Sequence, residues 1–199
     1  MKFIVGYNLK EFEKYYKTLD DLHNYFKTIG LADVTFGEIG DIEKLLIKSD
    51  PSHLIVWRQN NEIIGHTIWH ESNTDEHRKG APRDKEDKQM LRRLIGTKKD
   101  FIELHEIWLK TKHRGNGYGK KFFQFFESFI KKRGYNSIIY YTDNPATIAI
   151  CRKRGYKEDF LKTENWHIFY LNLNSKQTLF KSSFSQRKNS KFNVYMRGV

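Results

Sequence analysis

A glycine-rich turn at residues 114–119, Arg-Gly-Asn-Gly-Tyr-Gly, is the part of this sequence best suited to chemistry. It joins a predicted strand, Phe101–Lys110, to a predicted helix that begins near Tyr118 and continues to about residue 132. Glycines leave successive N–H groups unobstructed, and a helix N-terminus favours anions. Arg114 and Lys120 add positive charge. The turn therefore predicts a phosphate-binding loop; the alternative is a turn that is glycine-rich only because strand and helix pack tightly.

This loop matches neither of two common phosphate motifs. No Gly-Lys-Ser/Thr follows, as a P-loop requires, and Lys120 stands where a dinucleotide fingerprint has its third glycine. A second motif lies at residues 144–156, Asn-Pro-Ala-Thr-Ile-Ala-Ile-Cys-Arg-Lys-Arg-Gly-Tyr. Pro145 suits the first turn of a short helix, and Gly155 suits its end.

Together the two motifs resemble those of the GNAT superfamily of acyl-CoA-dependent N-acyltransferases. The family's pyrophosphate motif is Arg/Gln-x-x-Gly-x-Gly/Ala, and its second motif is Asn-x-x-Ala-x-x-Leu-Tyr-x-Lys-x-Gly-Phe. The resemblance is closest over residues 100–160. It implies an α/β (mixed α+β) fold with a central, mostly antiparallel sheet that is splayed at one parallel strand pair, with helices on both faces.

The resemblance also implies that acetyl-CoA is a co-substrate, lying between the strands at 101–110 and 137–142. The strand backbone before the loop would pair with pantetheine, the loop would hold the pyrophosphate, and Asn144 would approach the pantetheine or the thioester. Lys153 or Arg154 would reach the 3′-phosphate, or would be solvated charges at a helix end. The cofactor-binding residues implied in this way are Ile107, Trp108, Leu109, Arg114, Gly115, Asn116, Gly117, Tyr118, Gly119, Lys120 and Asn144.

Amine acetylation needs a general base, because at pH 7 fewer than about one in a thousand free lysine amines is neutral. Glu103, His105 and Glu106 are the candidates on the strand. Glu103 is favoured because it lies 11 residues before Arg114, where some family members carry their catalytic glutamate. The alternative is a carboxylate with no catalytic role.

The position of the family's usual tyrosine acid is occupied by Cys151. A thiol with a pKa near 8.5 can in principle protonate a leaving thiolate. A buried free cysteine is more often an inert apolar side chain, which is the favoured interpretation here. Tyr140, Tyr141 and Tyr156 are the substitutes considered, together with departure of the thiolate without a dedicated acid.

The elements that position these motifs follow from hydrophobic periodicity and turn residues. A helix is predicted over Leu9–Ile29, and Asn60-Asn61 predicts a tight hairpin between strands at His53–Arg58 and Glu62–His70. Residues 72–100 contain 15 charged residues of 29 and are interpreted mainly as a long insertion or mobile loop, with a helix considered for 84–95. Further strands are predicted at 3–7, 34–38, 137–142, 156–161 and 166–172, and further helices at 41–48 and 144–154.

Composition limits the class of protein. The 199 residues are 38% hydrophobic and 15% aromatic, enough for a sizeable core, and no apolar stretch is long enough to span a membrane. The single cysteine excludes an internal disulfide, and the start does not resemble a secretory signal, so we expect a cytoplasmic protein. The net charge is +12, and residues 172–199 hold six Lys/Arg and no Asp or Glu. We therefore expect one acyltransferase domain at 1–171 and a basic C-terminal extension at 172–199.

The expected partners are acyl-CoA and an amine acceptor: a protein N-terminus, a lysine or a small amine. A different class of function is a basic nucleic-acid- or ribosome-associated module with a degenerate acetyltransferase fold. It rests on the aromatic residues interleaved with basic ones in the C-terminal extension, and it is not favoured. We expect no bound metal, no membrane partner, and a monomer or homodimer.

Overall fold

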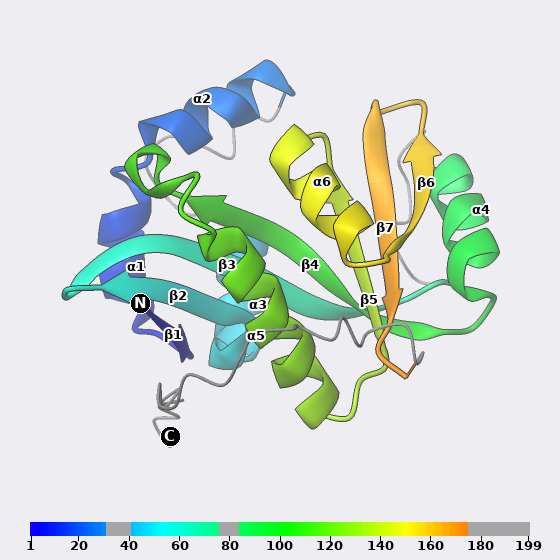
Figure 1. Ribbon diagram of the computed structural model, residues 1–199, viewed down its shortest axis with the longest axis horizontal. Helices are drawn as coiled ribbons and strands as arrows, with labels where there is room; N and C mark the ends of the chain where they lie inside the picture. Colours follow the sequence, from blue (N-terminus) through cyan, green and yellow to red (C-terminus); the bar gives the residue numbers. More distant parts are fainter. Residues whose placement is uncertain (31–40, 76–83, 175–199) are drawn as a thin grey trace, which may run out of the picture. The chain divides into compact units, whose positions relative to one another are not determined.

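A computed structural model describes residues 1–30, 41–75 and 84–174 (Figure 1). The elements are β1 (Lys2–Val5), α1 (Leu9–Tyr16), α2 (Asp20–Thr28), α3 (Asp41–Ser49), β2 (Leu54–Gln59), β3 (Glu62–Asn73), α4 (Asp84–Ile95), β4 (Asp100–Leu109), α5 (Tyr118–Lys132), β5 (Ser137–Thr142), α6 (Pro145–Lys153), β6 (Lys157–Leu161) and β7 (Trp166–Asn172), with 3₁₀ turns η2 (Pro51–His53) and η3 (Thr111–His113). The described chain forms two compact units. Among the described residues, the first contains 1–30, 41–69 and 106–118, and the second contains 70–75, 84–105 and 119–174.

The strands form a seven-stranded sheet in the order β1-β2-β3-β4-β5-β7-β6. β4 and β5 pair in parallel, with Ile102–Leu104 opposite Ile138–Tyr140. The β1–β2, β2–β3, β5–β7 and β6–β7 pairs are antiparallel. The mostly antiparallel sheet with one parallel pair confirms the predicted fold class.

The first unit is built on the predicted hairpin. Asn60 and Asn61 have φ values of 47° and 65°, the left-handed geometry of a two-residue turn between twisted strands. One face of the hairpin packs against α1 and α3. This core consists of Phe12, Tyr15, Tyr16, Leu19, Leu22, Ile47, Leu54, Val56 and Ile68.

The single helix predicted over residues 9–29 is wrong, because α1 ends at Tyr16 and α2 begins at Asp20. The break is a tightened turn in which the Thr18 and Leu19 N–H groups donate to carbonyls three residues back. Leu19 leaves helical geometry, at φ −99° and ψ 62°, and its side chain is buried in the core. Burial of this side chain favours the break over a continuous helix.

The second unit has helices against both faces of its strands. Met90 and Leu91 of α4 pack with Ile139 and Tyr141 of β5, whereas Phe123 of α5 lies edge-on to Tyr140. Alternation along β5 sends these side chains to opposite faces. α5 itself buries Phe122, Phe123, Phe126 and Ile130, together with Glu127.

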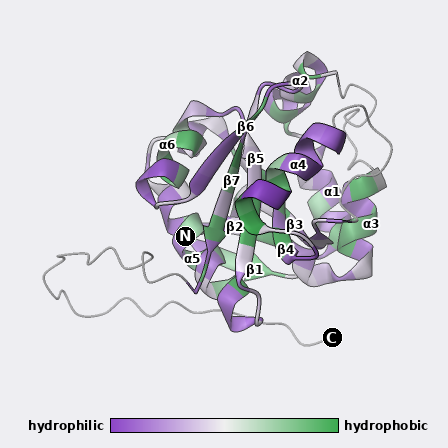
Figure 2. Cartoon of the chain, turned by 90° about the vertical axis from the view of Figure 1, so that its right-hand side faces the viewer, coloured by the Kyte–Doolittle hydropathy of each residue, from purple (hydrophilic) through white to green (hydrophobic). Residues whose placement is uncertain are grey.

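The helix considered for residues 84–95 is confirmed as α4, so the interpretation of 72–100 as mainly an insertion or mobile loop is wrong for that segment. The helix is largely hydrophilic (Figure 2), and its few apolar side chains include the two that are fully buried, Met90 and Leu91. The Tyr141 hydroxyl donates to the Asp87 carboxylate at 2.7 Å, which adds a polar contact to this packing. Leu94 and Ile95 are partly buried against the same cluster, so the apolar residues of α4 lie in its C-terminal half and face β5.

Two predicted features lie outside the described residues: the strand at 34–38 and most of the basic extension. Packing continues past Asn172, since Leu173 is buried and its N–H donates to the Asn136 carbonyl at 2.8 Å.

No helix in the three described ranges is long and apolar enough to cross a bilayer.

Candidate active site

The loop between η3 and α5 has the backbone geometry that requires glycine. Gly115 and Gly117 have φ values of 78° and 72°. A Cβ atom built on either residue would meet nothing within 4 Å, so tight packing does not explain these two glycines. At Gly119 the packing explanation does hold, because a Cβ there would lie 3.3 Å from Ile150 Cδ1. The loop is therefore open at two glycines and packed at the third.

Side chains of the same segment hold the open loop in place. The Asn116 amide donates to the carbonyls of His113 and Arg114, at 3.2 Å each. The Tyr118 hydroxyl, at the first residue of α5, donates to Gln59 Oε1 at 3.0 Å. The contacts of Asn116 and Tyr118 therefore hold the loop in place, while open space remains beside Gly115 and Gly117.

The Arg114 guanidinium lies over the indole of Trp108, with its central carbon 4.6 Å from the ring centroid. Its Nε donates to the Leu109 carbonyl at 2.9 Å, so one of the predicted pantetheine-pairing groups already accepts a hydrogen bond. A Cβ on Gly65 would lie 2.6 Å from the Trp108 carbonyl oxygen, which makes glycine obligatory at that position on β3. No local pattern indicates that Gly65 is required, because the requirement arises only when β3 lies beside β4.

Asn144 caps α6. Its Oδ1 accepts from the N–H groups of Ala146 and Thr147, at 3.0 and 3.2 Å. Helix capping alone therefore accounts for the residue type. The side chain is exposed, and its Nδ2 is not used by the cap.

Arg154 forms a buried ion pair, which neither a 3′-phosphate contact nor a solvated charge at a helix end describes. Its Nε donates to Glu127 Oε1 at 2.6 Å, its Nη2 contacts Oε2, and the Tyr156 hydroxyl donates to the same carboxylate at 3.2 Å. This ion pair is mostly buried between α5 and α6. Lys153 is exposed.

Cys151 is fully buried. Desolvation raises the pKa of its thiol to about 12, and the nearby Glu127 carboxylate acts in the same direction. The pKa of Tyr156 is likewise raised by burial, and its hydroxyl is engaged with Glu127. This environment favours an inert Cys151.

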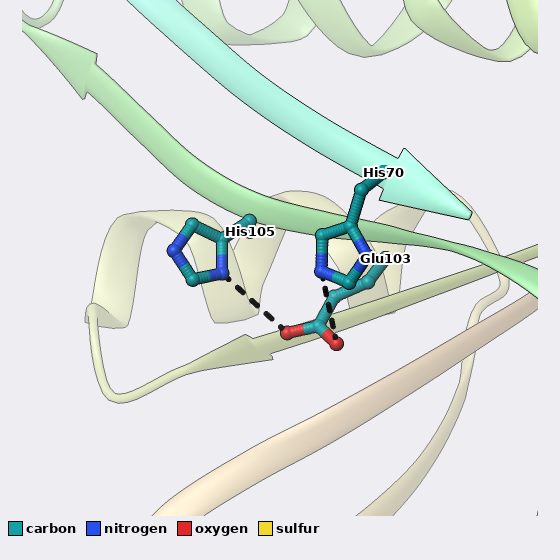
Figure 3. Close-up of side chains that lie close together, drawn as sticks. All are labelled: His70, Glu103 and His105. Atoms are coloured by element: carbon teal, nitrogen blue, oxygen red, sulfur yellow. Dashed lines mark ion pairs between the residues drawn. The ribbon is translucent and has the colours of Figure 1, made fainter. Parts of the chain in front are cut away.

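Glu103, the favoured base, lies in the second unit beside two histidines (Figure 3). His105 comes from the same strand and His70 from β3. The Glu103 carboxylate is buried, whereas the two imidazoles are partly exposed. His70 was not singled out in the sequence, because its neighbour Glu103 lies on another strand.

Glu106, the alternative base, belongs to a buried network in the first unit. Its Oε1 contacts His66 Nε2, and its Oε2 accepts from the Tyr16 hydroxyl at 3.2 Å. The Tyr15 hydroxyl lies 3.2 Å from the other nitrogen of His66. Burial, reinforced by the Glu106 charge, raises the pKa of both tyrosines. His66 and Tyr16 contact the two oxygens of Glu106, which indicates that this carboxylate has a structural role in the core.

The predicted cofactor-binding residues are divided between the two units. Those from Ile107 to Tyr118 lie in the first, and Gly119, Lys120 and Asn144 lie in the second. β4 and β5 form the parallel pair, and the open glycine loop lies between β4 and α5, as expected for an acetyltransferase fold.

The comparisons with known proteins agree. The sequence profile of the acetyltransferase (GNAT) family matches residues 15–156. The chain therefore belongs to this family and is an enzyme of the N-acetyltransferase class. No curated protein matches it in sequence.

Solved structures of low sequence identity share the fold. A putative arylalkylamine N-acetyltransferase 7 from the mosquito Aedes aegypti aligns with a TM-score of 0.59 at 14% identity, covering 78% of each chain. A chain of the NatC complex bound to Gag peptide and CoA aligns with a TM-score of 0.53 at 13% identity, covering 86% of this chain and 99% of that one. A putative acetyltransferase from Staphylococcus aureus Mu50 gives 0.51 at 14% identity, with coverage of 86% and 99%.

Proposed function

We propose that the protein transfers the acetyl group of acetyl-CoA directly to an amine, within a ternary complex. The observation that carries the proposal is the loop at Gly115–Gly117, whose two left-handed glycines leave open space immediately before α5. N–H groups in such a loop, together with a helix N-terminus, suit a pyrophosphate. A side chain at either glycine would occupy that space.

Acetyl-CoA would supply the activated acyl group as a thioester. Arg114, held against Trp108 and the Leu109 carbonyl, would place positive charge beside the phosphates. The exposed Nδ2 of Asn144 is free of the α6 cap and would donate to a cofactor carbonyl. The backbone of Ile107 and Trp108 remains the proposed partner of the pantetheine arm.

Glu103 is our proposed general base. A protonated amine cannot attack a thioester, so a carboxylate must accept its proton first. Glu106 lies in the core, where its oxygens contact His66 and Tyr16. Glu103 lies beside two partly exposed histidines, and this nearby access from solvent favours Glu103 as the base. His70 and His105 lie within 4 Å of its carboxylate oxygens and would orient it.

No side chain is assigned to protonate the leaving thiolate. Cys151 and Tyr156 are buried with raised pKa values, which makes both of them poor acids. A thiolate with an ordinary pKa near 8.5 is stable enough near neutral pH to leave without one. The acceptor is left open among protein N-termini, lysines and small amines.

The test begins with calorimetric binding of acetyl-CoA, followed by CoA release with a panel of peptides and polyamines. Glu103→Gln should keep the affinity for acetyl-CoA and lower turnover by about 10²–10⁴-fold. Glu106→Gln is the matched control, a buried carboxylate on the same strand, and should change stability more than turnover. Unchanged turnover in Glu103→Gln would move the base to Glu106 or His105. Failure of the wild-type protein to bind acetyl-CoA would contradict the proposal as a whole.

A further inference from the structure

His70, Glu103 and His105 form a compact set of metal-binding side chains. His70 Nε2 lies 3.6 Å from Glu103 Oε2, and His105 Nδ1 lies 3.8 Å from Glu103 Oε1. One potential ligand atom from each of the three residues falls within 4.8 Å of the others. Figure 3 shows both rings with a nitrogen turned toward the carboxylate.

These separations are too long for hydrogen bonds but match the spacing of ligands around a metal ion. Hydrogen bonds from nitrogen to oxygen usually measure about 2.7–3.2 Å. Zinc binds nitrogen and carboxylate oxygen at about 2.0–2.2 Å in a tetrahedral arrangement, which places neighbouring ligand atoms about 3.3–3.6 Å apart. The two Glu103–histidine separations lie within a few tenths of an ångström of that range, although they involve different carboxylate oxygens. The three ligand atoms lie within 4.8 Å of one another, so the side chains would draw closer together around a bound ion.

The hydrogen bonding of His70 prepares it as a ligand. Its Nδ1 lies 2.8 Å from the Glu71 backbone carbonyl, which can only accept, so Nδ1 carries the proton. In the neutral ring Nε2 then keeps its lone pair, and Nε2 is the atom that faces Glu103. An imidazole whose second nitrogen donates to a carbonyl is the usual arrangement of a metal-bound histidine.

Burial and access also suit an ion. The Glu103 side chain is only 3% exposed, and a positive charge beside a buried carboxylate stabilises its ionised form. Each histidine side chain is 20% exposed, which gives an ion from solvent a route to the cluster.

We propose that His70, Glu103 and His105 bind one divalent zinc ion, with an open fourth position for water. Two histidines and one glutamate are a known protein ligand set for zinc. Bound zinc would take the lone pairs of Glu103 and inhibit acetyl transfer; this consequence, unlike the binding itself, rests on the proposed role of Glu103 as base. This proposal departs from the expectation of no bound metal, because the three ligands come from two strands and form no motif along the chain.

The test uses the full chain without a histidine tag, stripped of metal with a chelator. Zinc affinity is measured by competition with a chromophoric chelator, and cobalt is added separately to detect the visible absorption of four-coordinate Co²⁺. His70→Gln and His105→Gln should each weaken zinc binding by about 10²-fold or more, because loss of a supporting residue alone costs about 10–100-fold. Circular dichroism and thermal melting establish that each variant folds.

His167→Gln is the matched control. His167 Nδ1 lies 2.6 Å from Glu158, and the histidine side chain is 24% exposed, so this is a histidine–glutamate pair of similar exposure. Among the described residues it belongs to no group of three potential ligands. Its replacement should leave zinc affinity unchanged.

Several outcomes would overturn the metal site: no zinc binding by the wild-type protein, or unchanged binding in folded His70→Gln or His105→Gln. The two proposals fail separately. If zinc binds here while acetyl transfer continues, the site stands and Glu103 is not the base. If Glu103→Gln abolishes turnover but the protein binds no zinc, the base assignment stands and the metal site is wrong.

Discussion

Replacement of Gly117 by alanine tests the phosphate loop most directly. Gly134, just after α5, provides a matched control, since it also has a positive φ, of 91°, and a Cβ there would also meet nothing within 4 Å. The two substitutions impose the same kind of backbone strain. They differ in that only Gly117 lies in the proposed cradle.

The expected magnitudes separate strain from ligand binding. An L-residue in the left-handed region costs about 1–2 kcal/mol, so both variants should lose about that much of the free energy of unfolding. In Gly117→Ala the new methyl group also enters the cradle. Loss of one hydrogen bond to a charged phosphate, about 1.5–3 kcal/mol, would raise the Kd for acetyl-CoA by about 10- to 150-fold. Gly134→Ala should leave that Kd unchanged.

Urea unfolding gives the stability of each variant, and isothermal titration calorimetry gives its affinity for acetyl-CoA. Affinity should be measured well below the unfolding transition, so that both variants are fully folded. Wild-type affinity in Gly117→Ala would refute the cradle. An equal loss of affinity in both variants would show that strain, transmitted through α5, is the cause.

Two further substitutions test the second unit. Cys151→Ala should leave the rate of acetyl transfer unchanged. In the folded protein the pKa of the Cys151 thiol is raised from 9.0 to about 12. The stability that this thiol contributes is therefore present below pH 9 and is lost as the pH rises toward 12. Between pH 8 and pH 10 the free energy of unfolding, measured with urea, should therefore fall more for the wild type than for Cys151→Ala. A large loss of acetyl-transfer rate in the folded variant would instead identify the thiol as the general acid. Arg154→Met should lower the free energy of unfolding by about 3 kcal/mol, because it leaves the buried Glu127 without its cation. Calorimetry on the folded Arg154→Met variant should give unchanged affinity for acetyl-CoA. A clear loss of affinity would indicate that Arg154 binds the 3′-phosphate of the cofactor.

Local sequence determined the elements whose signals are local. The Asn60-Asn61 turn, the helix that follows the glycine-rich loop and the start of α6 at Pro145 each depend on residues within a few positions of one another, and all three occur as predicted. The positive φ values of Gly115 and Gly117 agree with the glycine-rich loop for the same reason. The two motifs also sufficed to predict the family and the fold class.

Tertiary structure decided the features that depend on distant partners. The break before α2 follows from burial of Leu19 in a core that includes two strands, and α4 forms where β5 offers a face to cover. Arg154 is bound by Glu127, a contact that no spacing in the second motif indicates.

The surroundings of the two candidate bases were decided in the same way. The sequence placed Glu103 and Glu106 on one strand, but it could not show that Glu103 meets His70 while Glu106 meets His66 and two tyrosines. Strand register brings these side chains together across large sequence separations. Periodicity and capping describe only neighbours along the chain, so the family was evident from the sequence, whereas the environment of each carboxylate required the fold.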